Sequence, residues 1–333
     1  MKKFIILLIL ALISNDLLDS DTFIFKQFQK FIKKYHKNYA SLNEFLIRFE
    51  VFKTNVISTF KENKSHKTGI TQFSDLTKEE FTKIYLNFNY GTLSMANIDP
   101  YIIQSINAAP DYWDWRENGC VSPVFNQGNC AANWAFSTVD ILECLYFKNK
   151  GISNSFSEQQ LIDCDTLDNG CNGGSMINAL AWLKENGIMS DSDYPYTGYK
   201  STCKNDPSKY IDMKVTGYIK LGSSSSTFSP VDEDEMKEFL YENGLLSVGL
   251  NANPLQTYTE GIIDVPSSEC PANGINHLAI LVGYGHDEAS DKDYWIVKNS
   301  WGTVWGEKGY FRIRRGNGTC GINCYVITAT VSF

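Results

Sequence analysis

The chain has 333 residues, of which 43% are hydrophobic and 20% are charged, and this composition is typical of a globular protein with one large or two modest domains. Its formal net charge of -8 argues against a nucleic-acid partner, because a solvated acidic surface is sufficient to explain it. No internal repeat is visible, and no apolar run is long enough to span a membrane.

The first residues have the pattern of a secretory signal. Lys2 and Lys3 precede an unbroken apolar run from Phe4 to Ile13, and polar residues follow at once. The run is too short to cross a bilayer, so the pattern predicts a signal peptide over residues 1–19 that is later removed. The remaining protein is then expected to follow the secretory route without a membrane anchor.

Residues 20–108 differ from the rest of the chain, because they contain many lysines but no cysteine and no tryptophan. One helix is predicted from apolar residues at helical spacing, which are Phe25, Phe28, Phe31, Ile32 and Tyr35. A second helix is expected to begin at the capping box Ser41 to Glu44. Its apolar stripe is formed by Phe45, Phe49, Phe52, Val56 and Phe60. These patterns predict a helical subdomain that packs on the remainder of the protein.

From residue 109 onward, helical patterns come first and strand patterns follow. Helices are predicted over residues 133–150, 157–164 and 176–185, with Gly151 and Gly187 as the stop signals of the first and third. Strands are predicted over residues 245–250, 277–284, 294–298, 310–314 and 325–333. This order indicates an α+β fold with two packed halves.

The 9 cysteines are candidates for disulfide bonds in a secreted chain, and their odd number leaves at least one unpaired or paired with another chain. No Cys-x-x-Cys pair with a histidine partner is present, so we expect no metal and no cofactor. Two tripeptides, which begin at Asn63 and Asn317, have the form of glycosylation acceptors, and their occupancy is open.

Three stretches of the sequence carry a recognisable pattern. The first reads Gln-Gly-Asn-Cys-Ala-Ala-Asn-Trp-Ala-Phe-Ser over residues 127–137, and the others are residues 276–279 and 298–302. Together they resemble the papain family of cysteine proteases, in particular its cathepsin L-like branch. The resemblance implies a papain-like two-domain fold over residues 109–333, with a helical left domain, an antiparallel β-barrel-like right domain and a cleft between them.

The resemblance also implies a role for the polar residues of these stretches. Gln127 matches the oxyanion-hole glutamine, and His277 matches the base. Asn299 matches the asparagine that orients the base, and Trp301 matches the indole that shields this pair. The nucleophile position, a cysteine in the family, is Asn133 here. Because the lone pair of an amide nitrogen is delocalised, this side chain cannot attack a peptide carbonyl.

Asn133 has an ordinary structural interpretation as well. Asparagine is among the best N-cap residues, so this side chain is expected to cap the helix that begins there and to bond with His277. Cys130 is a poor replacement nucleophile, because it lies three residues earlier and is the expected disulfide partner of Cys171.

Other residues match the walls of the family's cleft. Gly173 and Gly174 are expected to present backbone groups to an extended peptide, as strand addition requires. The residues that match the main specificity pocket are Met176, Ile275, Leu278 and Tyr325. Leu278 is larger than the alanine or glycine usual at its position and is expected to narrow the pocket. All four are equally consistent with ordinary core residues.

Residues 20–108 resemble the inhibitory propeptide of cathepsin L-like enzymes. The interrupted helical motif is matched by Glu44, Arg48, Phe52, Asn55 and Asn63, with Thr59 in place of isoleucine. Residues 69–75 resemble the second propeptide motif, with Thr71 in place of asparagine. The resemblance implies a zymogen whose propeptide runs backwards through the cleft until it is cleaved near Ala108 or Ala109.

The same resemblance implies three disulfide bonds, which are Cys130–Cys171, Cys164–Cys203 and Cys270–Cys320. It leaves Cys120, Cys144 and Cys324 outside the usual pattern. A Cys120–Cys324 bridge is one possible pairing of these residues.

Three functions therefore remain open. The first is a catalytically impaired, monomeric protease homologue, delivered to a lysosome-like compartment or secreted, whose cleft binds peptides, its own propeptide or cystatin-like inhibitors. The second is an active lysosomal or secreted cysteine-type endopeptidase, which requires a reactive thiol near His277. The third is a structural or storage protein, whose cleft binds no peptide.

Overall fold

The computed structural model describes residues 15–61, 64–88, 109–222 and 230–333. The predicted signal peptide therefore lies largely outside the described residues, although helix α2 already begins at Asn15. Asn63 and Ala108 also lie outside them. In the part of the chain that the structure describes, no helix is long and apolar enough to cross a membrane.

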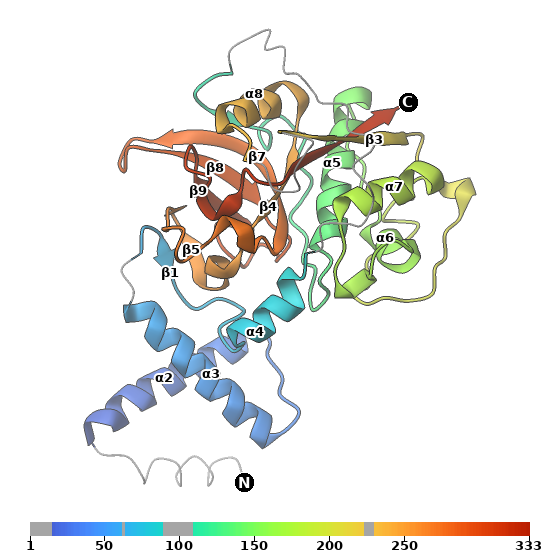
Figure 1. Cartoon of the computed structure of the whole chain (residues 1–333). Coiled ribbons are helices and arrows are strands. Elements are labelled where there is room, and N and C mark those ends of the chain that lie inside the picture. The colour runs from blue at the N-terminus through green and yellow to red at the C-terminus, as the bar shows by residue number, and fades with distance from the viewer. Residues whose placement is uncertain (1–14, 62–63, 89–108, 223–229) are drawn as a thin grey trace.

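The structure consists of an N-terminal segment (residues 15–88) and a body (residues 109–333), as Figure 1 shows. The α-helices are α2 (Asn15–Lys34), α3 (Leu42–Lys61), α4 (Lys78–Phe81), α5 (Asn133–Lys150), α6 (Glu158–Cys164), α7 (Met176–Asn186) and α8 (Glu233–Asn243). The strands are β1 (Lys67–Thr68), β2 (Trp113–Asp114), β3 (Lys214–Lys220), β4 (Leu246–Leu250), β5 (Tyr258–Glu260), β6 (Ile262–Ile263), β7 (His277–Asp287), β8 (Lys292–Lys298), β9 (Tyr310–Arg314) and β10 (Val326–Ser332).

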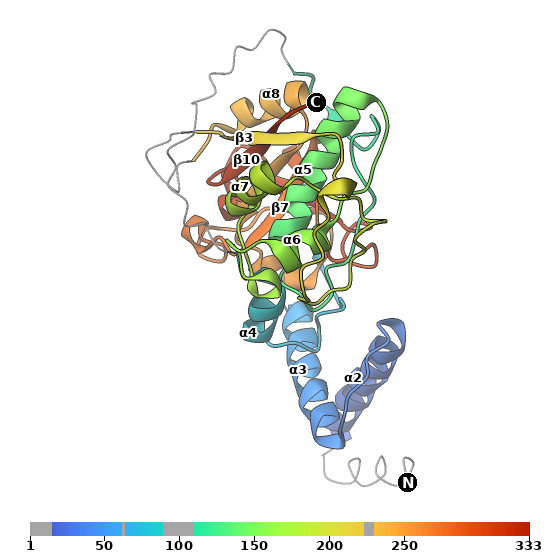
Figure 2. The ribbon, with the colours of Figure 1, turned by 90° about the vertical axis from the view of Figure 1, so that its right-hand side faces the viewer.

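Helices α2 and α3 cross beside the body and have a small aromatic core of their own (Figures 1 and 2). The ring of Phe52 lies 5.1 Å from that of Phe28 and 5.0 Å from that of Phe31. The predicted stripe of α3 ends early, since Phe60, its last member, is 72% exposed. The two helices thus form a unit whose core is separate from that of the body.

The N-terminal segment is bound to the body along its second half. Strand β1 pairs antiparallel with β5 of the body. The hydroxyl of Thr71 donates to the carbonyl of Gln256 at 2.5 Å. A five-residue π-helix (Thr82–Leu86) then leads the chain over the edge of the body. These contacts fix the course of the segment before it reaches the predicted site.

The body has an eight-stranded sheet in the order β3-β10-β4-β7-β8-β9-β6, with β2 paired on β7. Helix α5 contacts β4, β7 and β10 on one side and α6 and α7 on the other (Figure 1). It ends at Gly151, whose φ of 72° is the left-handed conformation that favours glycine. The α+β prediction is therefore confirmed, with α5 between the sheet and the smaller helices.

Helix α8 and strands β3, β5 and β6 of the second half were not predicted. Helix α8, which is capped by the side chain of Asp232, and strand β3 both precede the first predicted strand. The sequence of α8 is strongly acidic, and only Met236, Phe239 and Leu240 give it an apolar face.

Four disulfide bonds are present, Cys120–Cys144, Cys130–Cys171, Cys164–Cys203 and Cys270–Cys320. They include the three pairs that the resemblance implied. The suggested Cys120–Cys324 bridge is wrong, because Cys144 on α5 brings its Cα within 4.7 Å of that of Cys120. All nine cysteines are among the described residues, and Cys324 alone is unpaired and buried.

Candidate active site

The predicted site residues converge where α5 meets one end of the sheet. Asn133 is the first residue of α5, and His277 is the first residue of β7. Asn299 and Trp301 directly follow β8, the strand that pairs with β7. All four side chains are at least 97% buried.

His277 is held in one orientation by its neighbours. Its Nε2 lies 2.9 Å from Oδ1 of Asn299, and its ring lies 5.0 Å from that of Trp301. Since Oδ1 accepts a hydrogen bond, Nε2 carries the proton in the neutral ring, and the lone pair is on Nδ1. Nδ1 has no hydrogen-bond partner among the described residues.

Burial lowers the pKa of His277 to about 4, although the side chain of Asn299 and the backbone of Tyr85 both act to raise it. The imidazole is therefore neutral at any pH well above that value. A papain-type pair of thiolate and imidazolium is absent from this arrangement on both counts, because the ring is neutral and Asn133 has no thiol.

Asn133 does not cap its helix, so that prediction is wrong. The N-cap is Ala132, which makes no side-chain hydrogen bond, and Asn133 is already helical. Its side chain therefore reaches across the site: Nδ2 donates to the carbonyls of Tyr85 at 3.2 Å and Leu86 at 3.0 Å. Its Oδ1 accepts from the backbone N–H of Leu278 at 3.4 Å, next to His277 but not from the imidazole itself.

Gln127 approaches the backbone carbonyl of Tyr85 from a second direction. Its Nε2 donates to the carbonyl of Cys130 at 2.8 Å and to that of Tyr85 at 3.3 Å. Its Oε1 accepts from the hydroxyl of Ser300 at 2.6 Å, which fixes the orientation of the amide. Two side-chain amides thus converge on the Tyr85 carbonyl oxygen, and convergent N–H donors are what an oxyanion hole requires.

The two predicted glycines serve different purposes. Gly173 has a φ of 103°, and a Cβ there would collide with the carbonyl of Asn87 in the N-terminal segment. A Cβ on Gly174 would instead come within 2.6 Å of the Trp134 ring and 2.8 Å of Asp168 inside the body. Only Gly173 is therefore a contact surface for the chain that occupies the site.

The four predicted pocket residues, Met176, Ile275, Leu278 and Tyr325, are all buried. One contact ties this set to the N-terminal segment: the ring of Phe88 lies 5.1 Å from that of Tyr325. The backbone N–H of Phe88 also donates to the carbonyl of Asn276 at 3.1 Å. An aromatic side chain therefore occupies the place where the specificity pocket was expected.

Sequence reasoning missed residues 82–88 as part of the site. The propeptide resemblance implied that the segment crosses the cleft, but no motif marked these positions. The residues that touch the site are Tyr85, Leu86, Asn87 and Phe88, and the backbone carbonyls of Tyr85 and Leu86 accept from its side-chain amides. The side chains of Tyr85, Asn87 and Phe88 also contact the body. Backbone contacts leave little trace in side-chain patterns.

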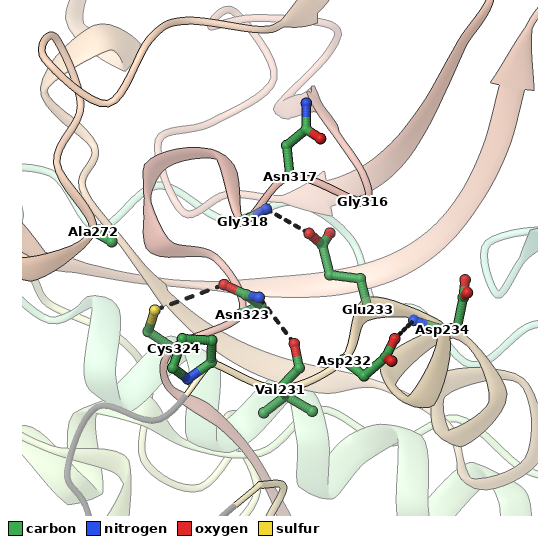
Figure 3. A pocket seen from close by; sticks show the side chains of 11 residues that line it. Val231, Asp232, Glu233, Asp234, Ala272, Gly316, Asn317, Gly318, Asn323 and Cys324 are labelled. Atoms are coloured by element: carbon green, nitrogen blue, oxygen red, sulfur yellow. Dashed lines mark hydrogen bonds between the residues drawn. The ribbon is translucent and has the colours of Figure 1, made fainter.

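A separate cavity of about 540 Å³ lies at the start of α8 (Figure 3). The free Cys324 and the carboxylates of Asp232, Glu233 and Asp234 are among its lining residues. None of the predicted site residues lines it. Within the described ranges, no group of three or more His, Cys, Asp or Glu side chains is arranged to hold a metal ion.

Comparison with known families gives two matches. Residues 109–330 match the papain family cysteine protease model, and residues 28–81 match the cathepsin propeptide inhibitor domain. The chain belongs to the papain family of cysteine proteases. The body has the papain-like fold, and the N-terminal segment contains the chain's own inhibitor domain.

Individual relatives support this assignment. The chain is 39% identical to cysteine proteinase 15A of Pisum sativum over 325 residues, covering 92% of this chain and 86% of the relative. It is 38% identical to cathepsin F of Mus musculus over 311 residues, covering 92% of this chain and 64% of that protein.

Solved structures of papain-family proforms have the same architecture. The digestive procathepsin L 3 of Tenebrio molitor larval midgut aligns with a TM-score of 0.81 at 32% identity, covering 92% of this chain and 99% of that one. The recombinant stem bromelain precursor aligns with a TM-score of 0.79 at 33% identity, covering 92% and 98%.

Proposed function

We propose that this chain is a catalytically inactive papain-family protein that binds extended peptides in its cleft without hydrolysing them. The observation that carries the proposal is the bonding of Asn133. At the position of the family's nucleophile, its amide nitrogen donates to two consecutive peptide carbonyls, Tyr85 and Leu86. An amide in this place holds a peptide backbone and cannot attack it.

No other thiol is available to replace the nucleophile. Cys130 is closed in a disulfide with Cys171, and Cys324, the only free thiol among the described residues, lines the cavity of Figure 3. Burial, followed by the charge of Glu233, raises the pKa of the Cys324 thiol, which opposes formation of a thiolate.

The remaining parts of the site suit binding. Gln127 and Asn133 both donate to one carbonyl oxygen, and Gly173 leaves room for a peptide backbone. The occupant in this structure is the chain's own N-terminal segment. A peptide that replaced it would meet the same donors, so we expect hydrogen bonding to the peptide main chain and a hydrophobic or aromatic side chain in the place of Phe88.

The proposal includes the maturation and routing of the chain. Residues 1–19 act as a signal peptide, residues 20–108 are the inhibitory propeptide, and residues 109–333 form the binding domain. The protein enters the secretory pathway and acts as a monomer in a lysosome-like compartment or outside the cell. Cystatin-like inhibitors, which dock on papain-type clefts, are expected to bind it as well.

The test compares three full-length proteins, the natural chain, Asn133→Cys and Asn133→Cys combined with His277→Ala, each after release of the N-terminal segment at mildly acidic pH. We expect a fluorogenic peptide to be hydrolysed by Asn133→Cys only. The natural chain should bind the same peptide, as measured by fluorescence anisotropy. A cysteine-directed electrophile should add no mass to it at the site, as measured by mass spectrometry.

Each other outcome points to a different function. Hydrolysis by the natural chain, together with labelling of a cysteine that abolishes it, would establish an active endopeptidase and refute the proposal. Absence of peptide binding by the natural chain would leave a structural or storage protein. If Asn133→Cys is inactive but the natural chain binds peptide, the binding function stands and the catalytic geometry has been lost beyond residue 133.

A further inference from the structure

The first described residue of the body has an unusual partner. The backbone N–H of Ala109 donates to both carboxylate oxygens of Glu238 in helix α8, at 3.1 and 3.0 Å. Ala109 is only 8% exposed, and the Glu238 side chain lies 129 residues further along the chain. The start of the body is therefore fixed to α8 by a carboxylate.

This bonding leaves the carboxylate incompletely satisfied. One hydrogen is shared between two oxygens that together accept about four hydrogen bonds. Among the ion pairs of the described residues, none involves Glu238, although neighbouring acidic residues of α8, such as Asp234, do have a cationic partner. A partly buried carboxylate of this kind is stabilised by a cation that brings several donors at once.

A second buried acceptor lies in the same place. Tyr284 is fully buried, and its hydroxyl has no hydrogen-bond partner among the described residues. The ring of Tyr284 packs beside α8, since the Lys237 ammonium lies 5.4 Å from its centroid. Burial, followed by the charge of Glu238, raises the pKa of the Tyr284 hydroxyl. Strand β2 pairs with β7 at this point, since Trp113 is opposite Tyr284 in the sheet register.

We infer that Glu238 is a receptor for the α-ammonium group of a chain that begins at Ala109. Hydrolysis of the peptide bond before Ala109 adds one water, releases residue 108 as a carboxylate and leaves an amine on Ala109 that takes up a proton. The ammonium has three hydrogens, enough for one to each Glu238 oxygen and one for a further acceptor. The single shared hydrogen of the uncut chain is thereby replaced by charge-assisted bonds.

Glu238 stabilises the product of cleavage before Ala109 more than the product of cleavage at a neighbouring peptide bond. A cut one residue earlier moves the ammonium by about 3.8 Å, one Cα spacing, and leaves an amide N–H at Glu238. The papain family match also begins at residue 109. On the function proposed above the cut is made by another endopeptidase, but the receptor works in the same way whichever protease makes it.

The experiment uses two full-length chains with an enteropeptidase site, one in place of residues 104–108 and one in place of residues 103–107. Cleavage leaves Ala109 as the terminus in the first and Ala108 in the second. The rate of α-amine acylation by an N-hydroxysuccinimide ester is measured by mass spectrometry as a function of pH. Both chains are also made with Glu238→Gln and with Glu242→Gln, a matched change one turn further along α8.

We expect the α-amine of Ala109 to react at least about tenfold more slowly near neutral pH than that of Ala108, which corresponds to a rise of one unit in its pKa. Glu238→Gln should abolish this difference, and Glu242→Gln should retain it. Equal rates at the two termini, or a difference that survives Glu238→Gln, would overturn the inference. If Glu238→Gln does not fold, the comparison of the two termini in the natural sequence still decides. Because enteropeptidase makes the cut, the result is independent of whether the cleft hydrolyses peptides.

Discussion

The side-chain nitrogen of Asn133 donates a 3.0 Å hydrogen bond to the backbone carbonyl of Leu86, which lies 47 residues earlier in the chain. The bond joins the first turn of the longest helix of the body to the N-terminal segment that covers it. A cysteine thiol is a weak donor and has only one hydrogen, so it cannot make the pair of bonds that this amide makes. On the function proposed above, the residue that stands in the nucleophile's place therefore also strengthens the closed form.

Loss of this amide should loosen the N-terminal segment. Asn133→Ala removes the bonds to Tyr85 and Leu86 and leaves both carbonyls unsatisfied in a buried place. At about 0.5–1.5 kcal/mol per hydrogen bond, we expect the segment to bind about 1–3 kcal/mol more weakly, or roughly 5- to 150-fold. The measurement is dissociation of the segment after a cut within residues 89–108.

The matched control for this change is Asn186→Ala. The side chain of Asn186 donates only within its own helix, to the carbonyl of Trp182, so the segment should dissociate as in the natural chain. Asn133→Asp should weaken binding more than Asn133→Ala, because a carboxylate faces two carbonyl oxygens without a hydrogen to offer. If the cut N-terminal segment dissociates equally from Asn133→Ala and from the natural chain, the role assigned to this side chain is contradicted.

Much of the fold could be predicted from the sequence, where patterns are local. The helix from Asn133 to Lys150 and its end at Gly151 follow from spacing and from one glycine. Helix α8 was missed because its acidic residues obscure a short apolar face. The Cys120–Cys144 bond was missed because pairing depends on which segments meet in space, and the spacing of cysteines does not determine that.

The site was harder to predict than the fold. Motifs pointed to Gln127, His277 and Asn299 because each occurs in a distinctive stretch, and the three lie close together in the structure. The direction of the Asn133 side chain was not predictable in this way. The helix begins at Asn133 and its N-cap is Ala132, one position earlier than the cap expected from the sequence. Because of this shift, the Asn133 side chain points toward the N-terminal segment and not back onto its own helix. The occupant of the site, residues 85–88, meets Gln127 and Asn133 through backbone carbonyls, and such contacts leave no signature in the sequence.

Gly173 offers a test of the peptide-binding surface. In Gly173→Ala the new Cβ meets the carbonyl of Asn87, and the φ of 103° is also strained. Gly128→Ala is the matched control, because its φ is 59° but nothing lies within 4 Å of its Cβ position. We expect Gly173→Ala to weaken binding of the N-terminal segment at least about tenfold, or about 1.4 kcal/mol. Equal effects of the two substitutions would show that backbone strain alone is responsible.

Glu143 should make the body less stable at alkaline pH. Burial, followed by the charge of Asp140, raises the pKa of this carboxyl from 4.5 to about 7. The folded state therefore binds the proton more tightly than the unfolded state, and the stability that this contributes is complete below 4.5 and lost as the pH rises through 7. Glu143→Gln is neutral at every pH and should be more stable than the natural chain at pH 8, by about 1–3 kcal/mol.

Denaturant unfolding at pH 5 and pH 8 checks this prediction. The difference in free energy of unfolding between Glu143→Gln and the natural chain should be small at pH 5 and should appear at pH 8. Glutamine keeps a side-chain oxygen that accepts the hydrogen bond from the N–H of Phe156. Glu185→Gln, on the exposed face of α7, should leave both values unchanged. Parallel pH profiles for Glu143→Gln and the natural chain would contradict the prediction.

His277 should make the closed form less stable at acidic pH. Its pKa is lowered from 6.5 to about 4 while the N-terminal segment covers it, because the imidazole is completely buried. Release of the segment exposes the ring and restores a more ordinary pKa, so the open form binds a proton that the closed form excludes. The stability of the closed form is complete above pH 6.5 and falls as the pH is lowered toward 4, by as much as about 3 kcal/mol.

The measurement is dissociation of the cut N-terminal segment between pH 7 and pH 4, in the natural chain and in His277→Gln. Glutamine keeps a donor toward Asn299 but does not titrate, so its profile should be flatter across this range. Carboxyl groups at the interface, such as that of Glu260 beside Lys67, are common to both proteins, and the difference between the two profiles therefore isolates the histidine. His286→Gln, at an exposed position beside Asp293, should follow the natural chain. A difference profile that is flat between pH 6.5 and 4 would show that the buried imidazole does not control opening.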